Sequence, residues 1–107
     1  MVGIHQFVRI GTGVILGAGS MVSKDIPPYC NATGDRAKLR GLNIEGMRRR
    51  GFSKDQIQAL KKTYRILFQL RMRTKEAAEK VRREVPQTRE VEQMIRFIEG
   101  SQRGICR

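Results

Sequence analysis

The 107-residue sequence predicts a β-helix plus α fold, in which the last coils of a parallel β-helix are followed by a C-terminal three-helix cap. Two observations carry this prediction. An aliphatic residue stands at every sixth position from Ile4 to Val22, which fits neither the helical period of 3.6 nor the strand period of 2. After residue 52 the apolar spacing becomes helical. We therefore expect three domains: 1–28 (β-helix), 29–52 (a connecting segment) and 53–107 (helices).

The first part of the chain consists of hexapeptides. Each begins with an aliphatic residue, and glycine follows in two of them; the first positions are Ile4, Ile10, Leu16 and Val22. Six residues would make one short strand and a turn, which form one side of a triangular coil, and coils bury their core only by stacking. Three hexapeptides make a coil, so we expect further coils before residue 1. We expect the ladder to end at Pro27–Pro28, because proline cannot donate to it.

Helix signals begin at Ser53, which forms a capping box with Gln56 at the start of a helix reaching about Leu70. Thr74 is the expected N-cap of a second helix, which ends at residue 84 or 85, before a proline. A third apolar stripe, at 91–98, precedes a glycine. We expect the residues between the last hexapeptide and these helices to form an irregular connection.

The charge is distributed unevenly. The formal net charge is +12, and residues 1–35 contribute none of it. Six basic residues against one acidic residue lie at positions 36–50, which favours an anionic partner. Cys30 and Cys106 have no metal-type spacing, so we expect free thiols in a reducing compartment, with a disulfide as the alternative. The sequence shows no signal peptide and no membrane span, and we expect a cytoplasmic protein.

A family resemblance rests on four segments: "NIEGMRRRGFS" at 43–53, "IHQF" at 4–7, "DIPPY" at 25–29 and "GDRAKLRGLN" at 34–43. In these the chain resembles the acyl-carrier-protein-dependent UDP-N-acetylglucosamine O-acyltransferases, which carry out the first step of lipid A biosynthesis in Gram-negative bacteria. The resemblance runs from residue 1 to residue 107 and covers only the C-terminal part of the family.

The resemblance implies a homotrimer of left-handed β-helices with active sites between neighbouring subunits. In the family, a histidine acts as general base on the sugar 3-hydroxyl, which attacks the acyl thioester. That histidine matches a coil upstream of residue 1, so we expect no catalytic residue in this chain and no turnover by the chain alone. The resemblance implies no metal and no cofactor, since the acyl carrier protein thioester is a co-substrate.

The resemblance also implies substrate-binding residues. His5 and Gln6 match a pair lining the substrate groove, and four later residues match nucleotide-sugar contacts: Asn43, Glu45, Arg49 and Arg50. Arginine presents a planar fork of donors that suits phosphate oxygens. Arg49 is the first candidate for phosphate and Arg50 the second. Arg36 stands where some members carry a histidine, so that histidine's contacts do not transfer.

Two other functions remain open from the sequence. A basic nucleic-acid-binding module would fit the net charge, but six aromatic residues without basic interleaving argue against a specific nucleic-acid partner. A non-catalytic assembly subunit, which completes a trimer made by another chain, is the second alternative.

Overall fold

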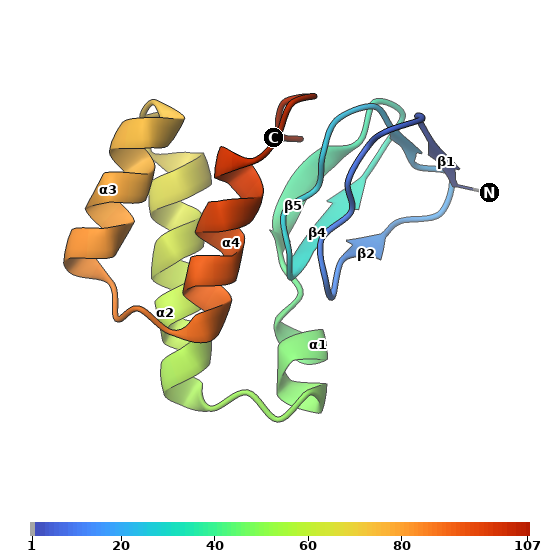
Figure 1. Cartoon of the computed structure of the whole chain (residues 1–107). Coiled ribbons are helices and arrows are strands. Elements are labelled where there is room, and N and C mark those ends of the chain that lie inside the picture. Colours follow the sequence, from blue (N-terminus) through green and yellow to red (C-terminus); the bar gives the residue numbers. More distant parts are fainter. Residues whose placement is uncertain (1) are drawn as a thin grey trace.

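The computed structural model describes residues 2–107, so Met1, with which the expected first domain starts, lies outside the described part. Short strands and loops at residues 2–42, here called the coil region, lie beside a group of helices, and a short helix joins the two parts (Figure 1). The strands are β1 (Gly3–Ile4), β2 (Ile15–Leu16), β3 (Met21–Val22), β4 (Cys30–Thr33) and β5 (Lys38–Leu42). The segment after the last helix runs back towards the coil region.

The parallel pairing of β1 with β3 in the coil region follows the hexapeptide spacing. Gly3 pairs with Met21 and Ile4 with Val22, which is a separation of three hexapeptides. A further parallel bridge joins Ile10 to Ile26. Directly paired residues of neighbouring strands face the same side of a sheet. Val22 and Ile26 are fully buried, so their partners Ile4 and Ile10 face the same interior although they are 49% and 37% exposed.

The ladder does not end at Pro27–Pro28, and that expectation is wrong. β2 pairs in parallel with β4, beyond the prolines. The prolines lie at a corner, where their missing donors are not needed. The Ile26 amide on one side donates to the Arg9 carbonyl at 2.9 Å, and the Tyr29 amide on the other donates to the Thr12 carbonyl at 2.7 Å.

The connecting segment is also more regular than expected. β4 and β5 form an antiparallel hairpin with an irregular register between Asn31 and Ala32. Its turn contains Gly34 and Arg36, both at positive φ. The short helix α1 (Ile44–Arg49) follows at once and leads into the helical part.

Of two expected helix starts, the one at Ser53 is confirmed and the one at Thr74 is wrong. Helix α2 (Lys54–Tyr64) has the full capping box between Ser53 and Gln56, as expected, and continues as a π-helix, η1 (Arg65–Gln69). Thr74, however, is the first residue of α3 (Thr74–Glu84) and not its N-cap. Arg73 occupies the cap position and no side chain caps the helix. α4 (Arg89–Glu99) is capped by Thr88 and ends at Gly100.

The apolar stripes of the helices meet in one core. α4 packs against α2 and α3, and α3 packs against η1. Fully buried side chains at their contacts include Leu60, Leu67, Val81, Met94 and Ile95. Among residues 2–107, no helix combines the length and the apolar character that crossing a bilayer requires.

Residues 101–107, here called the tail, attach to the coil region through Asp25. The Asp25 amide donates to the Gly104 carbonyl at 2.9 Å, and the Cys106 amide donates to the Asp25 carbonyl at 2.8 Å. The Asp25 carboxylate accepts bonds from the Ser101 hydroxyl at 2.7 Å and the Arg9 amide at 2.8 Å. Asp25 is only 1% exposed, and both of its carboxylate oxygens have a partner. The tail is therefore held firmly against the coil region.

Candidate functional site

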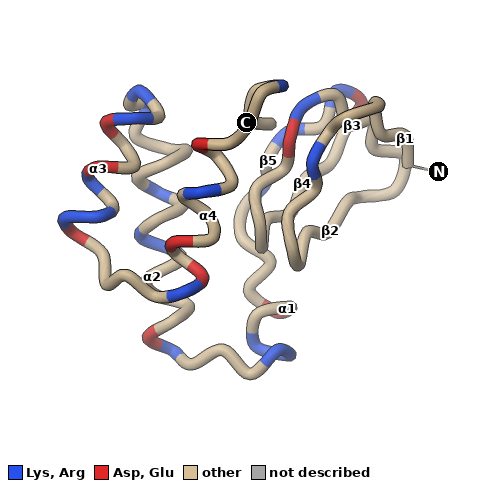
Figure 2. The backbone as a smooth tube through the Cα atoms, viewed as in Figure 1, with Lys and Arg blue, Asp and Glu red and all other residues tan. Residues whose placement is uncertain are grey.

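Four of the six predicted substrate-binding residues lie together on α1. Asn43 stands at its N-cap, Glu45 and Arg49 lie within it and Arg50 at its C-cap. Figure 2 shows a basic cluster at the end of this helix, at the lower edge of the coil region. The sequence segment "NIEGMRRR" thus folds into one short helix that presents several of its polar side chains on the outside of the molecule.

Asn43 holds α1 on the coil region. Its side-chain oxygen accepts a bond from the Gly46 amide at 3.0 Å, which caps the helix. Its side-chain nitrogen donates to the Gly13 carbonyl at 3.0 Å. The Asn43 amide donates to the Tyr29 carbonyl at 2.7 Å. The side chain is nearly buried, so its first role is to fix the position of α1.

Glu45 and Arg49 form an exposed ion pair one helical turn apart. The Arg49 guanidinium lies 2.7 Å from the Glu45 carboxylate, and their side chains are 79% and 76% exposed. Exposed pairs of this kind contribute little to stability. Arg49 can therefore exchange Glu45 for another anion at low cost.

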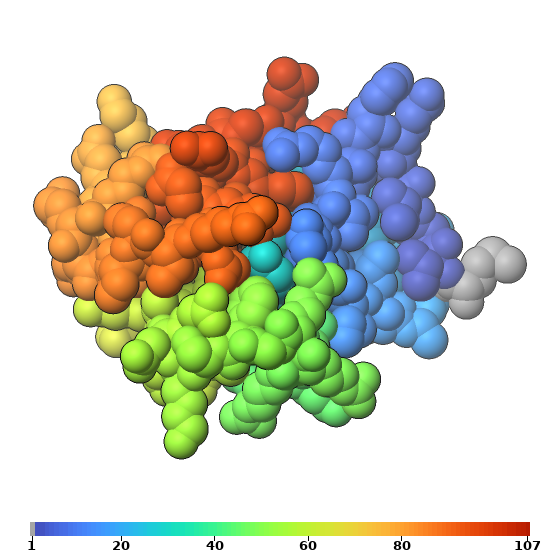
Figure 3. Space-filling model, turned by 60° about the horizontal axis from the view of Figure 1, so that its bottom comes forward, coloured from blue at the N-terminus to red at the C-terminus, as the bar shows by residue number. Residues whose placement is uncertain are grey.

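Arg50 lines a cleft of about 720 Å³ between the coil region, the segment joining α1 to α2, and α4. These three parts of the chain meet in the view of Figure 3. The cleft is close to the coil backbone at Gly13, whose φ of +72° suits glycine. A side chain at Gly13 would come within 2.9 Å of the Tyr29 ring and 3.7 Å of the Arg50 guanidinium.

A chain of hydrogen bonds forms one wall of this cleft. The Tyr29 hydroxyl donates to the Gln93 side-chain oxygen at 2.6 Å, and the Gln93 side-chain nitrogen donates to the Thr12 hydroxyl at 3.2 Å. Burial raises the pKa of Tyr29, and Glu90 adds to the rise, whereas Arg50 and Arg89 oppose it. The Tyr29 hydroxyl therefore stays protonated near neutral pH and ties α4 to the coil region.

Arg89 is a second cation in the cleft, and no sequence motif predicted it. It is the first residue of α4 and lines the cleft beside Arg50. Within residues 2–107, neither arginine has a carboxylate partner within 4.0 Å. The cleft's acidic residue, Glu90, accepts a bond from Gln56 at 2.8 Å. The two guanidinium groups are thus available to an anion.

His5 and Gln6 lie apart from this cluster. They are exposed in the turn after β1 and do not line the cleft beside Arg50. The His5 amide donates to the Val22 carbonyl at 2.8 Å, which fixes the backbone there. β1 and α1 are at different ends of the coil region (Figure 1). Within one chain, the six predicted residues form two separate groups.

The hexapeptide spacing and the parallel pairing of short strands define the class as a hexapeptide-repeat protein. Residues 25–106 match the family model described as UDP-N-acetylglucosamine O-acyltransferase, domain 2. The chain belongs to this family, which confirms the resemblance seen in its sequence.

Individual relatives agree with this assignment. The chain is 46% identical to an acyl-[acyl-carrier-protein]–UDP-N-acetylglucosamine O-acyltransferase from Myxococcus xanthus. The alignment spans 104 residues and covers 97% of this chain and 40% of the relative. A solved UDP-N-acetylglucosamine acyltransferase from Bacteroides fragilis superposes with a TM-score of 0.95 at 44% identity, over 99% of this chain and 42% of that one. LpxA from Acinetobacter baumannii superposes with a TM-score of 0.94 at 39% identity, with the same coverages. The chain therefore spans about 40% of the length of these relatives.

Proposed function

We propose that this chain is the C-terminal portion of an enzyme that transfers a 3-hydroxyacyl chain from acyl carrier protein to the 3-hydroxyl of UDP-N-acetylglucosamine. This reaction would be the first step of lipid A biosynthesis. Membership of the acyltransferase family and identities of 44–46% to proteins with that name support the proposal. The observation that carries it is the α1 segment, where the predicted phosphate ligands stand beside a cation-lined cleft.

The proposal includes the architecture that the resemblance implies. The coil region would be the last part of a left-handed parallel β-helix, and α2–η1, α3 and α4 would form its three-helix cap. The domain boundaries at 28 and 52 belong to this proposal. Parallel pairing crosses the first of them, because β2 pairs with β4. Two free, buried thiols, Cys30 and Cys106, support a cytoplasmic location, since reducing compartments keep thiols reduced.

In the proposed site, Arg49 and Arg50 bind the diphosphate. Each guanidinium offers a planar fork of donors, and neither is committed to a buried carboxylate in the described part of the chain. Glu45, released from Arg49, can accept from a ribose hydroxyl or a base N–H. Asn43 retains one amide hydrogen and a second lone pair, while its two present bonds keep α1 in place.

Catalysis would need residues that this chain does not supply. His5, with Gln6, belongs in the proposal to the substrate groove of a neighbouring subunit, and the general base belongs to an upstream coil. The acyl carrier protein thioester would be the only co-substrate, and no metal or other cofactor takes part in the proposed reaction. We therefore expect binding of nucleotide-sugar without turnover.

Titration with UDP-N-acetylglucosamine, followed by calorimetry, tests this function. We expect saturable binding that weakens at least tenfold in R50Q, because one diphosphate partner is lost. R73Q, which removes an exposed arginine at the start of α3, is the matched control and should bind like the parent chain. Equal affinity in R50Q would overturn the assignment. So would absence of binding in a sample that sediments as a trimer.

A further inference from the structure

A second groove lies where the tail, the coil region and the helices meet. It has a volume of about 1090 Å³, slightly above the usual size range of small-molecule sites. It shares no lining residue with the cleft beside Arg50 and contains none of the six predicted substrate-binding residues. Its walls come from the corner after β3, the start of β5, the start of α3, the end of α4 and the tail.

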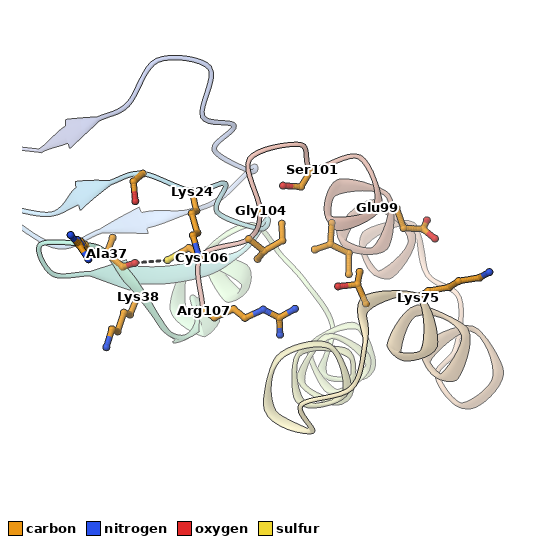
Figure 4. A pocket seen from close by; sticks show the side chains of 14 residues that line it. Lys24, Ala37, Lys38, Lys75, Glu99, Ser101, Gly104, Cys106 and Arg107 are labelled. Atoms are coloured by element: carbon orange, nitrogen blue, oxygen red, sulfur yellow. Dashed lines mark hydrogen bonds between the residues drawn. The ribbon is translucent and has the colours of Figure 1, made fainter.

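The groove carries excess positive charge. Lys24, Lys38 and Arg107 line it, and within residues 2–107 none of them has a carboxylate partner within 4.0 Å. In Figure 4, the Lys24 side chain ends beside Cys106 on the strand side of the groove, and the Arg107 side chain extends from the tail towards the helices. The acidic lining residue, Glu99, is held by Arg82 through two bonds of 2.9 and 3.1 Å. The charge of these cations is thus not neutralised locally.

Apolar groups lie beside these cations. Ala37, Ile98 and Ile105 line the same groove, and Ile98 is only 6% exposed. The Cys106 thiol donates to the Ala37 carbonyl at 2.7 Å, which joins the tail to the strand edge and leaves that carbonyl satisfied (Figure 4). The groove therefore offers two kinds of surface, a cationic one and an apolar one.

The wall formed by the tail is already in place. The tail backbone bonds both the amide and the carbonyl of Asp25, and the Ser101 hydroxyl donates to the buried Asp25 carboxylate. A site whose walls are fixed before binding loses less conformational entropy when a ligand enters. The groove is thus preorganised and does not depend on closure of a loop.

We propose that this groove binds a small anionic amphiphile, with its phosphate or carboxylate head between Lys24 and Arg107 and its alkyl chain against Ile98 and Ile105. An inorganic anion would leave the apolar wall in contact with water, and a neutral alkyl compound would leave the cations without a partner. This site is additional to the proposed nucleotide-sugar site and uses none of its residues.

Calorimetric titration of the full chain with decyl phosphate, below its micelle concentration, tests the proposal. We expect one molecule bound per chain and at least tenfold weaker binding of inorganic phosphate and of decanol. Decanoate as a further ligand compares carboxylate with phosphate as the head group. K24Q/R107Q should weaken decyl phosphate binding at least tenfold, and K24R/R107K should restore it. K61Q/R65Q removes the same two residue types from α2 and η1 and should bind like the parent chain.

Amide chemical shifts locate the bound molecule. We expect decyl phosphate to shift the amides of Ala37, Ile105 and Cys106. Shifts confined to the exposed apolar residues around Phe7 and Ile15, or equal binding by K24Q/R107Q, would overturn the proposal. If that variant does not fold, the shift map of the parent chain decides. Binding of UDP-N-acetylglucosamine serves as a separate readout, because Arg50 and Arg89 lie outside this groove.

Discussion

Asn43 connects two parts of the molecule through one side chain. Its oxygen caps α1 and its nitrogen reaches the Gly13 carbonyl of the coil region. Gly46 makes this possible, because a side chain there would overlap the Asn43 amide group. The first and fourth residues of "NIEG" are thus required together for the position of α1, which in turn sets where Arg49 and Arg50 stand.

Cys30 makes stability depend on pH in the alkaline range. Burial, with a smaller effect of Cys106, raises the pKa of the Cys30 thiol from about 9 to about 12. In the unfolded chain this thiol loses its proton near pH 9, whereas the folded chain keeps it. The unfolded state therefore binds fewer protons between pH 9 and pH 12, and stability falls as pH rises through this window. The contribution approaches about 1.4 kcal/mol per pH unit for one proton.

Urea unfolding at a series of pH values from 8 to 11 measures this effect. The free energy of unfolding should decline less steeply with pH in C30A than in the parent chain. The difference in slope should correspond to close to one proton. Tyr64 is present in both proteins, and its pKa is raised to about 12 by burial, with a smaller effect of Cys30. The difference between the two curves therefore reports the Cys30 thiol together with its effect on Tyr64. Parallel curves for the two proteins would show that the buried thiol does not titrate differently on unfolding.

Among the elements, α2 and α3 begin in different ways, and this difference gives a prediction. Ser53 accepts from the Gln56 amide at 3.1 Å and completes a capping box, while Thr74 makes no cap bond. S53A should lower the free energy of unfolding by about 1 kcal/mol, since a lost N-cap typically costs that much. T74A should change it by less than about 0.5 kcal/mol, as for ordinary surface positions. Chemical denaturation of both variants measures the difference, and similar losses would contradict the observed helix starts.

How well the sequence predicted an element depended on the range of its signals. The capping box and the stripe at 91–98 are local, and both helices were predicted within a few residues. The β4–β5 hairpin was missed because its strands are only four and five residues long, and their alternation is interrupted by an irregular register at Asn31–Ala32 and by Gly41. The ladder beyond Pro27–Pro28 was missed because a corner can accommodate proline, and a corner is defined only by the stacked coil.

For the site, the family resemblance indicated Arg50 but not Arg89. The cleft exists because α4 packs beside the coil region and Gln93 bonds both Tyr29 and Thr12. The segment "TREV" at 88–91 contains no motif that would connect Arg89 with Arg50, which lies 39 positions earlier. That connection arises only from tertiary packing, which sequence spacing does not encode.

At the scale of the whole molecule, the coil region leaves apolar side chains in contact with water. Large exposed ones are Val2, Ile4, Phe7, Ile10, Ile15 and Met21, of which Phe7 is 79% exposed. Several large exposed apolar side chains within one part of a chain favour association. It supports the proposed homotrimer, in which neighbouring subunits would cover this surface.

Sedimentation at micromolar concentrations tests the trimer. We expect the parent chain to sediment as a trimer and F7S/I15S to shift towards monomer. L70S changes an exposed leucine at the end of η1, outside the coil region, and should remain trimeric. A monodisperse parent monomer that melts cooperatively would contradict the proposed assembly.

The attachment of the tail to Asp25 affects how the protein emerges from the ribosome. Ser101, which bonds the Asp25 carboxylate, is translated 76 residues after it. Until then the carboxylate lacks its hydroxyl partner, and the strand edge at residue 25 lacks Gly104 and Cys106. Contacts of such long sequence separation form late and slow the folding of a chain. Nascent chains that stall before residue 101 would therefore expose this edge, and quality-control proteases and chaperones would meet them as incomplete molecules.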